Sequence, residues 1–356
     1  MLLSFRRAVL RVHTPAGPLT TVGRMFGVLR DAASSAWLPR AGTPAASSRA
    51  FHYERVLGTS LEIQIAAADE ACARYAESTV LAELDRLEQI LSGYSATSEL
   101  AQWQLQHDVT VPVSPELADV LVAAEAWRVR TGGAFNSAAV SLVELLRDPV
   151  TSGVPDAAAR GRAIREHIHA MRQPLWTVNR ASGKACRLTS LPISLDAIAK
   201  GYIVDRAALV AKEVNGVTQV LVNIGGDLRH LGSRPVLVGV ADPNAPAENA
   251  APLCSVRLTG EALATSGGYR RGFMMDGQAV SHIVDPRSGK PVSRVVSASV
   301  IAPDCMTADA LSTAFSVMTP AESVALADEV GGVGCLLVEQ DGTMTSNDAW
   351  RTRLAT

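Results

Sequence analysis

The sequence predicts an α+β fold built from mixed, mostly antiparallel sheets with packed helices. Short runs of alternating apolar residues are typical of strands, and apolar stripes with helical spacing lie between them. The two kinds of segment do not alternate in the regular order of a parallel sheet, which favours α+β over a doubly wound fold. Hydrophobic residues make up 47% of the 356 residues, enough for a sizeable core.

The expected elements follow one another from about residue 51. Strict alternation predicts a strand over 56–65, and an apolar stripe followed by Gly93 predicts a helix over 69–91. Ser114 and Pro115 mark the start of a second helix, which ends at Gly132 and Gly133. Residues 148–192 are rich in Arg, Pro and Gly, and we expect strand and loop there.

The C-terminal half is expected to carry three further helices and four strands. Helices are predicted over 199–214 and 307–318, and a capping-box pattern at 319–322 opens the third. The predicted strands cover residues 217–224, 236–240, 297–302 and 335–339.

Charge and composition exclude several classes of function. The formal net charge of −2 gives no general attraction to nucleic acid or anionic lipid, and only 4% of the residues are aromatic. No run of 18 apolar residues exists, so we expect no transmembrane helix. The cysteines show no CxxC spacing and indicate neither a zinc site nor a disulfide framework. They are Cys72, Cys186, Cys254, Cys305 and Cys335.

Residues 1–50 differ from the rest of the chain. They hold seven arginines and one acidic residue, Asp31, together with many Ala, Ser and Pro. This composition resembles a transit peptide or export leader. A disordered extension is the alternative, as is a start assigned too early, with Met25 as the true start. We expect the folded domain to cover 51–356.

Two glycine-containing segments are candidates for binding a phosphate-bearing ligand. Residues 195–202 place small residues and Lys200 at the start of a predicted helix, where exposed amides suit a diphosphate. The strand over 217–224 ends at Gly225, Gly226 and Asp227, which allows close approach of a ligand. An ordinary helix start with a surface lysine and a tight turn explain the same two patterns.

Two further segments carry groups suited to acid–base and metal chemistry. His282 and Asp285 stand three residues apart, and His282 is a candidate proton acceptor or substrate anchor, or a structural hydrogen-bonding residue. Asp309 and Thr313 are four apart and share a helix face. With a nearby carbonyl they form the hard-oxygen set that Mg²⁺ prefers. Alternatively, Asp309 is an ordinary residue of a helix start and Thr313 bonds back to its own helix.

Taken together and in order, these segments resemble the ApbE family of FAD:protein FMN transferases. The family motifs are a GIAKGY-type turn, a VNxGGD strand end, an ATSG–SHIxDP pair and an ADALxT helix. The chain has AIAKGY at 197–202, VNIGGD at 222–227, ATSGGY at 264–269 with SHIVDP at 281–286, and TADALST at 307–313. The similarity runs from about residue 51 to the C-terminus and includes residues 57–59, 92–100 and 131–136.

The resemblance implies an ApbE-like (T-fold-like) architecture and a set of site residues. It implies metal ligation by the carbonyl of Ala197 and the side chains of Asp309 and Thr313. It implies flavin contacts at Leu57, Tyr94, Ala134, Phe135, Asn136, Ser194, Lys200 and His282. The family often has Asp at the positions of Asn136 and Ser194, and Asp196 is a candidate to replace a ribose or adenine contact.

The implied activity is Mg²⁺-dependent transfer of FMN from FAD to a threonine or serine of an acceptor protein, with release of AMP. His282 is the candidate group beside the reacting phosphate. The resemblance implies an acceptor with an Asp-Gly-x-Thr/Ser-Gly-Ala-Thr segment, an electron-transport flavoprotein subunit, and a periplasmic or cell-envelope location. A cytoplasmic or organellar location stays open. Two other functions also stay open: a non-catalytic FAD-binding protein, and an Mg²⁺-dependent FAD pyrophosphatase.

Overall fold

The computed structural model describes residues 47–147, 156–245, 250–267, 272–275, 278–281 and 283–355. Residues 1–46 of the expected leader or extension lie outside this range. Its last four residues belong to the first strand, β1 (Ser47–Val56), so the described fold begins slightly before residue 51.

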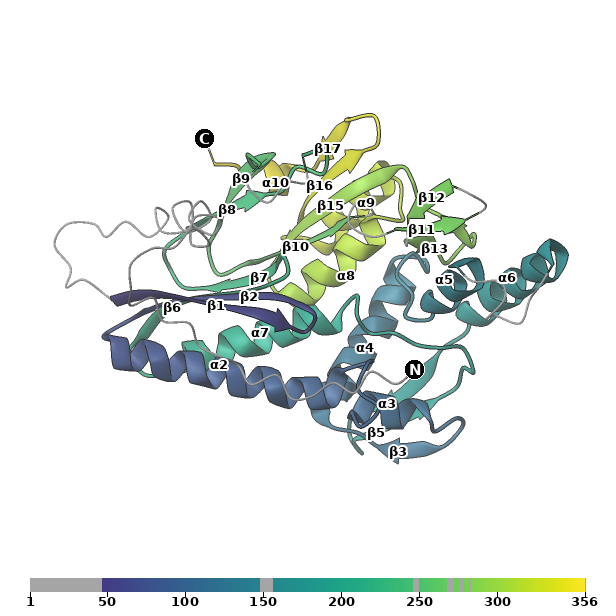
Figure 1. Cartoon of the computed structure of the whole chain (residues 1–356), viewed down its shortest axis with the longest axis horizontal. Coiled ribbons are helices and arrows are strands. Elements are labelled where there is room, and N and C mark those ends of the chain that lie inside the picture. Colours follow the sequence, from purple (N-terminus) through teal and green to yellow (C-terminus); the bar gives the residue numbers. More distant parts are fainter. Residues whose placement is uncertain are drawn as a thin grey trace.

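A twisted sheet of eight strands forms the centre of the fold (Figure 1). Every neighbouring pair of its strands is antiparallel, which confirms the predicted α+β class. Its strands, in order across the sheet, are β1, β2 (Thr59–Ala67), β6 (Val217–Ile224), β7 (Asp227–Leu231), β10 (Ala262–Gly267), β15 (Val295–Ala302), β16 (Gly334–Glu339) and β17 (Met344–Ser346).

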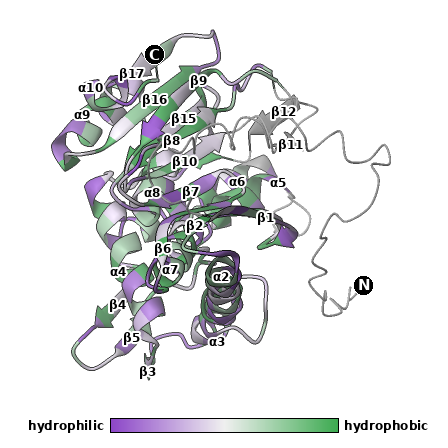
Figure 2. Ribbon diagram, turned by 90° about the vertical axis from the view of Figure 1, so that its left-hand side faces the viewer, coloured by the Kyte–Doolittle hydropathy of each residue, from purple (hydrophilic) through white to green (hydrophobic). Residues whose placement is uncertain are grey.

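Three helices cover one face of this sheet and position the candidate site. The long helix α2 (Glu70–Leu91) lies beside α7 (Ala199–Lys212), which packs on β6 and β7, and α8 (Cys305–Phe315) packs on β10 and β15 (Figures 1 and 2). The face of α7 towards its neighbours is made of small and branched apolar residues, which allows close helix contacts. Because α7 also contacts α8, residues near the starts of both helices come together.

The other elements surround this core. Around one end lie α3 (Glu99–Gln104), α4 (Pro115–Arg130), α5 (Val140–Arg147), α6 (Ala157–Met171) and the small sheet of β3 (Thr110–Pro112), β5 (Lys184–Arg187) and β4 (Trp176–Asn179). The remaining elements are β8 (Val236–Val240), β9 (Cys254–Leu258), β11 (Gly272–Met275), β12 (Gln278–Ser281), β13 (Val284–Asp285), β14 (Lys290–Pro291), α9 (Pro320–Val330) and α10 (Asp348–Arg351). None of the helices in the described residues is long and apolar enough to cross a membrane.

Most predicted helices are confirmed together with their caps. The Asp69 side chain accepts the N–H of Cys72 at the start of α2, and Ser114 caps α4. The capping box of Thr319 and Glu322 is present in α9. The strand predicted over 56–65 corresponds to β2, which starts at Thr59 after a two-residue turn.

The expectation of strand and loop over residues 148–192 is wrong for its central part. That segment contains α6, a four-turn helix rich in alanine and arginine, both good helix formers. Its N-cap is Asp156, whose side chain accepts the N–H of Ala159. The many Pro and Gly residues of the wider segment flank this helix, apart from Gly161, and they obscured its local pattern.

Candidate functional site

The carboxylate of Asp309 is bound to the backbone of α7. Asp309 lies on α8 and is only 4% exposed, and its Oδ2 accepts the N–H of Gly201 at 3.0 Å. Gly201 lies in the first turn of α7, 108 residues earlier in the chain. No described residue donates a hydrogen bond to the other oxygen, Oδ1. One oxygen is therefore fixed by the fold and the other is available to a ligand.

This bond has a direct consequence for the carbonyl of Ala197. In a regular helix the N–H of Gly201 would donate to the carbonyl four residues earlier, which is that of Ala197. Here the N–H points to Asp309, and no backbone N–H of the described residues bonds to the Ala197 carbonyl. The carbonyl oxygen of Ala197, which has no backbone donor, and the carboxylate of Asp309 therefore both lie near the N–H of Gly201. Two oxygen atoms close together are what a hard cation needs as ligands.

The hydroxyl of Thr313 is held from the neighbouring strand. Ser266 at the end of β10 contacts the hydroxyl of Thr313 at 3.3 Å and that of Ser312 at 2.9 Å. Ser312 in turn donates to the carbonyl of Asp309 at 2.9 Å. Thr313 lies one helical turn beyond Asp309, so its hydroxyl, held by Ser266, shares a face of α8 with the carboxylate that Gly201 holds.

Lys200 enters the same region from the first turn of α7 and makes an ion pair with Asp227 Oδ2. Burial by itself would lower the pKa of Lys200, but the carboxylates of Asp227 and Asp309 outweigh it and raise that pKa. Burial, assisted by the charge of Asp227, raises the pKa of Asp309 to about 8. The site therefore combines two buried carboxylates with one ammonium group, and a further cation would relieve the excess negative charge.

Close packing between α7 and α8 fixes the geometry of these groups. A Cβ on Gly201 would lie 2.3 Å from the carbonyl oxygen of Cys305, so only glycine permits this approach. One turn further along α7, Asp205 accepts the N–H groups of Cys305 and Met306 at 2.8 and 2.9 Å. Burial raises the pKa of Asp205 to about 6 despite these two bonds. The start of α8 is thereby anchored to α7 by backbone contact and by a side chain.

Two hairpin turns meet beside the ion pair. Leu57 and Gly58 form the two-residue turn between β1 and β2 with φ values of 49° and 77°, and Gly225 and Gly226 form the turn before Asp227. The side chain of Thr59 occupies the place where Gly225 would carry a Cβ, at 2.7 Å. The Leu57 turn is therefore adjacent to the strand end that supplies Asp227.

A second group of predicted residues is linked to the first through the segment before α7. The hydroxyl of Tyr94 donates to Asp196 at 2.8 Å, and the N–H of Asp196 donates to the hydroxyl of Ser194 at 3.1 Å. The N–H of Ser194 donates to the carbonyl of Ser137 at 2.8 Å. Tyr94 is 86% exposed, so its ring is accessible to a ligand.

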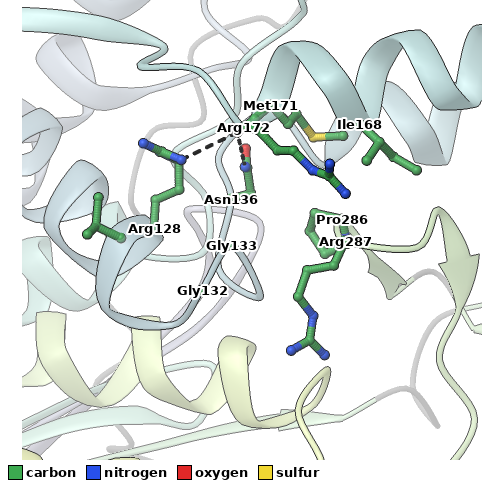
Figure 3. Close-up of a pocket in the computed structure, with 10 residues that line it drawn as sticks. Arg128, Gly132, Gly133, Asn136, Ile168, Met171, Arg172, Pro286 and Arg287 are labelled. Atoms are coloured by element: carbon green, nitrogen blue, oxygen red, sulfur yellow. Dashed lines mark hydrogen bonds between the residues drawn. The ribbon is translucent and has the colours of Figure 1, made fainter.

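A cavity of about 330 Å³ is lined by the loop that carries Asn136 (Figure 3). Three guanidinium groups from three elements line it: Arg128 of α4, Arg172 at the end of α6, and Arg287 between β13 and β14. Arg128 pairs with Glu125 at 2.7 Å. The amide of Asn136 donates to the carbonyl of Met171 at 3.1 Å, and its oxygen accepts the N–H of Ala138 at 3.0 Å.

Comparison with known proteins decides the family. The profile described as "ApbE family" matches residues 57–337. The chain belongs to the ApbE family. A relative named FAD:protein FMN transferase from Klebsiella pneumoniae is 28% identical over 304 residues, covering 80% of this chain and 83% of its own. One from Treponema pallidum with the same name is 30% identical over 306 residues, covering 81% and 84%.

Solved structures of the ApbE family share the fold. The ApbE protein of Thermotoga maritima matches with a TM-score of 0.75 and 26% identity, covering 87% of this chain and all of its own. The flavin transferase ApbE from Vibrio cholerae matches with a TM-score of 0.69 and 23% identity, covering 86% and 100%, and shows the fold alone. The predicted ApbE-like architecture is thereby confirmed.

The structure brings most predicted site residues of this ApbE-family chain into one connected region. Ala197, Lys200, Asp309 and Thr313 are joined through Gly201 and neighbouring groups, as described above. His282, the predicted catalytic residue, lies outside the described residues. Ala134 and Phe135 are buried beside Asn136, with 2% and 1% exposure, so neither residue presents an exposed surface to a ligand in this structure.

Four residues of this region were not predicted as site residues. Gly201, Asp227 and Ser266 occur in the motifs AIAKGY, VNIGGD and ATSGGY quoted above, and Asp205 lies three residues beyond AIAKGY. Their contacts join segments 27 to 108 residues apart, which no local pattern reveals. For Gly201, Asp227 and Ser266, the signal available in the sequence was their position within the quoted motifs.

Proposed function

We propose that this protein is an Mg²⁺-dependent FAD:protein FMN transferase. It transfers the FMN half of FAD to a threonine or serine hydroxyl of an acceptor protein and releases AMP. Membership of the ApbE family and the activity named for its relatives support the reaction class. The observation that carries the metal site is the N–H of Gly201, which bonds to Asp309 and leaves the Ala197 carbonyl without its helical donor.

The proposed cation ligands are the carbonyl of Ala197, the carboxylate of Asp309 and the hydroxyl of Thr313. Among the described residues, no group of three His, Cys, Asp or Glu side chains is placed to hold a metal alone. A site with a single carboxylate fits an ion that also binds the diphosphate of its substrate, as Mg²⁺ commonly does. Bound there, Mg²⁺ would neutralise charge on the diphosphate of FAD.

The transfer step exchanges one phosphorus–oxygen bond for another. The acceptor hydroxyl oxygen bonds to the FMN phosphorus, the bond from that phosphorus to the bridging oxygen breaks, and AMP leaves with the bridging oxygen. The hydroxyl proton passes to a base or to solvent, and His282 is our candidate for that base. Lys200, in the first turn of α7, is our candidate to offset charge on the phosphates.

The ring systems of FAD are proposed to lie against Tyr94 and in the cavity beside Asn136. The exposed ring of Tyr94, held by Asp196, offers a stacking surface. The cavity beside Asn136 has the size typical of small-molecule pockets, and its arginines and apolar side chains suit a polar aromatic group.

The experiment combines purified protein, FAD and Mg²⁺ with an acceptor protein carrying an Asp-Gly-x-Thr-Gly-Ala-Thr segment. We expect fast AMP release and a fluorescent flavin band on the acceptor, since a hydroxyl held in line gains about 7–11 kcal/mol of positioning in favourable cases. An acceptor whose final threonine is alanine is the matched control and should return the rate to background. If AMP release is equally fast without acceptor and all FMN stays free, the protein is an FAD pyrophosphatase instead.

A further inference from the structure

Asp227 is the first residue of β7 and is almost completely enclosed. Its side chain is 3% exposed, whereas that of Lys200 is 33% exposed, so the lysine reaches inward to make the ion pair. The backbone N–H of Thr265 donates to the same carboxylate. Within the described residues, Oδ2 of Asp227 accepts no hydrogen bond of good geometry, so the ammonium of Lys200 is its one compensating charge there.

Lys200 has a second carboxylate within electrostatic reach. The charges of Asp227 and Asp309 both act on its ammonium group, and Lys200 acts back on both carboxylates. Lys200 also precedes Gly201, whose N–H is bonded to Asp309, so the stem of the lysine starts beside that carboxylate. Yet the contact that Lys200 makes is with Asp227 and not with Asp309.

Burial raises the pKa of Asp227, while its contact with Lys200 lowers it. We treat the pair as ionised because the ammonium touches the carboxylate oxygen directly, which favours both charged forms. A buried ammonium that lost this partner would be driven towards the remaining carboxylate, since an uncompensated buried charge is strongly unfavourable.

From this arrangement we propose that Asp227 is a positioning residue that retains Lys200 and so keeps the carboxylate of Asp309 free for a divalent cation. The inference rests on the proposed function, since it takes Asp309 as a cation ligand. Asp227 itself is not a ligand in this scheme and acts only through Lys200. Its role is to prevent an internal ammonium from competing with the metal for one carboxylate.

The test measures binding of Mn²⁺, used as a probe for the divalent cation, by electron paramagnetic resonance in the absence of FAD. Asp227→Asn keeps the size of the side chain and removes the charge. We expect it to weaken Mn²⁺ binding at least about tenfold, because Lys200 then pairs with Asp309. Asp119→Asn is the charge control: it removes a carboxylate that pairs with Arg180 and holds neither Lys200 nor Asp309, and it should change Mn²⁺ binding less than about threefold.

The second arm removes the competing ammonium. If Asp227 acts only through Lys200, the double variant Lys200→Met/Asp227→Asn should bind Mn²⁺ as tightly as Lys200→Met alone. A structural or purely electrostatic role would instead leave the double variant as weak as Asp227→Asn. This comparison also serves if Asp227→Asn alone fails to fold, because both of its members lack the unpaired ammonium.

Wild-type Mn²⁺ affinity in Asp227→Asn, or a double variant weaker than Lys200→Met, would overturn the proposal. The variant Asp309→Asn tests separately whether Asp309 is a cation ligand at all. If that variant binds Mn²⁺ as the wild type does, Asp309 is not a ligand and the metal assignment itself is wrong. If it loses Mn²⁺ while Asp227→Asn does not, only the role of Asp227 is refuted.

Discussion

Replacing Gly201 with alanine tests how strictly the spacing of α7 and α8 sets the site. The added Cβ would lie 2.3 Å from the carbonyl oxygen of Cys305 and 2.7 Å from the Cα of Met306. Ordinary contact begins near 3.4 Å, so the two helices must separate by about 1 Å. The atoms in the way belong to the backbone and cannot turn aside as the end of a long side chain would.

Moving the two helices apart should have a small effect on the free energy of unfolding and a large effect on turnover. Overpacking against backbone costs about 1–3 kcal/mol, and the better helix propensity of alanine returns up to about 1 kcal/mol. We therefore expect a net loss of about 0–3 kcal/mol in the free energy of unfolding. The hydrogen bond from Gly201 to Asp309 is 3.0 Å long and would be broken by a shift of that size. A misplacement of about 1 Å can reduce turnover about 100-fold.

The assay compares Gly201→Ala with Gly161→Ala by urea unfolding, Mn²⁺ binding and FMN transfer to an acceptor. Gly161 lies within α6, and its nearest neighbour for a new Cβ is the flexible guanidinium of Arg165 at 3.5 Å. The control should gain about 0.5–1 kcal/mol in stability and keep full activity. If Gly201→Ala matches this control in stability, Mn²⁺ affinity and turnover, the contact between the helices does not set the geometry of the site.

Three further predictions address the ligands and the cavity. Val129→Trp should fill the cavity beside Asn136 and raise the KM for FAD about tenfold or more, while Leu105→Trp, at an exposed position away from it, should leave KM unchanged. Thr313→Val should weaken Mn²⁺ binding in calorimetry less than Asp309→Ala does, because water replaces a neutral ligand more readily than a carboxylate; equal losses would contradict this ranking. Because the pKa of Asp309 is raised to about 8, protons compete with the cation, and Mn²⁺ affinity should rise about tenfold or more between pH 6.5 and 8.5 and then level off. An affinity independent of pH would show that Asp309 is already ionised or is not a ligand.

The same pKa shift fixes the sign of its effect on stability without metal. Between the ordinary range of an aspartate and about pH 8, folded Asp309 retains a proton that the unfolded chain has released. The contribution of this residue to the free energy of unfolding is therefore present at low pH and declines as the pH rises through that window. Bound cation should reverse the decline, since the ionised carboxylate then has a partner.

Local signals made much of the fold predictable. The helices α2, α4 and α9 have N-caps or a capping box that can be read from a few adjacent residues, such as Asp69 and Ser114. Strand β1 and helix α6 were not predicted, because β1 is defined by its pairing with β2 and α6 is enclosed in a segment with misleading composition. Local periodicity describes an element well only where the element does not depend on a distant partner.

The candidate site shows the same division. Asp309 and Thr313 could be placed on one helix face from their spacing alone. That the N–H of Gly201 leaves its own helix to reach Asp309 could not, because the bond depends on how closely two helices approach each other. The sequence motifs therefore predicted which residues are candidate ligands. The tertiary contacts explain why the backbone carbonyl of Ala197 is available as one of them.

Asn136 shows how one departure from the common family pattern fits this particular chain. Its amide nitrogen donates to the carbonyl of Met171, and its oxygen accepts the N–H of Ala138. An ionised aspartate could accept the second bond but could not donate the first, and its charge would face a carbonyl oxygen. The amide of Asn136 thus holds the end of α6 to this loop together with Arg128, which donates to the same carbonyl at 3.5 Å, and the loop lines the cavity between Arg128, Arg172 and Arg287. Arg128 and Arg287 are already paired with Glu125 and Asp285, so a neutral residue at position 136 adds no further carboxylate beside Arg172, and that guanidinium can meet an anionic substrate such as FAD.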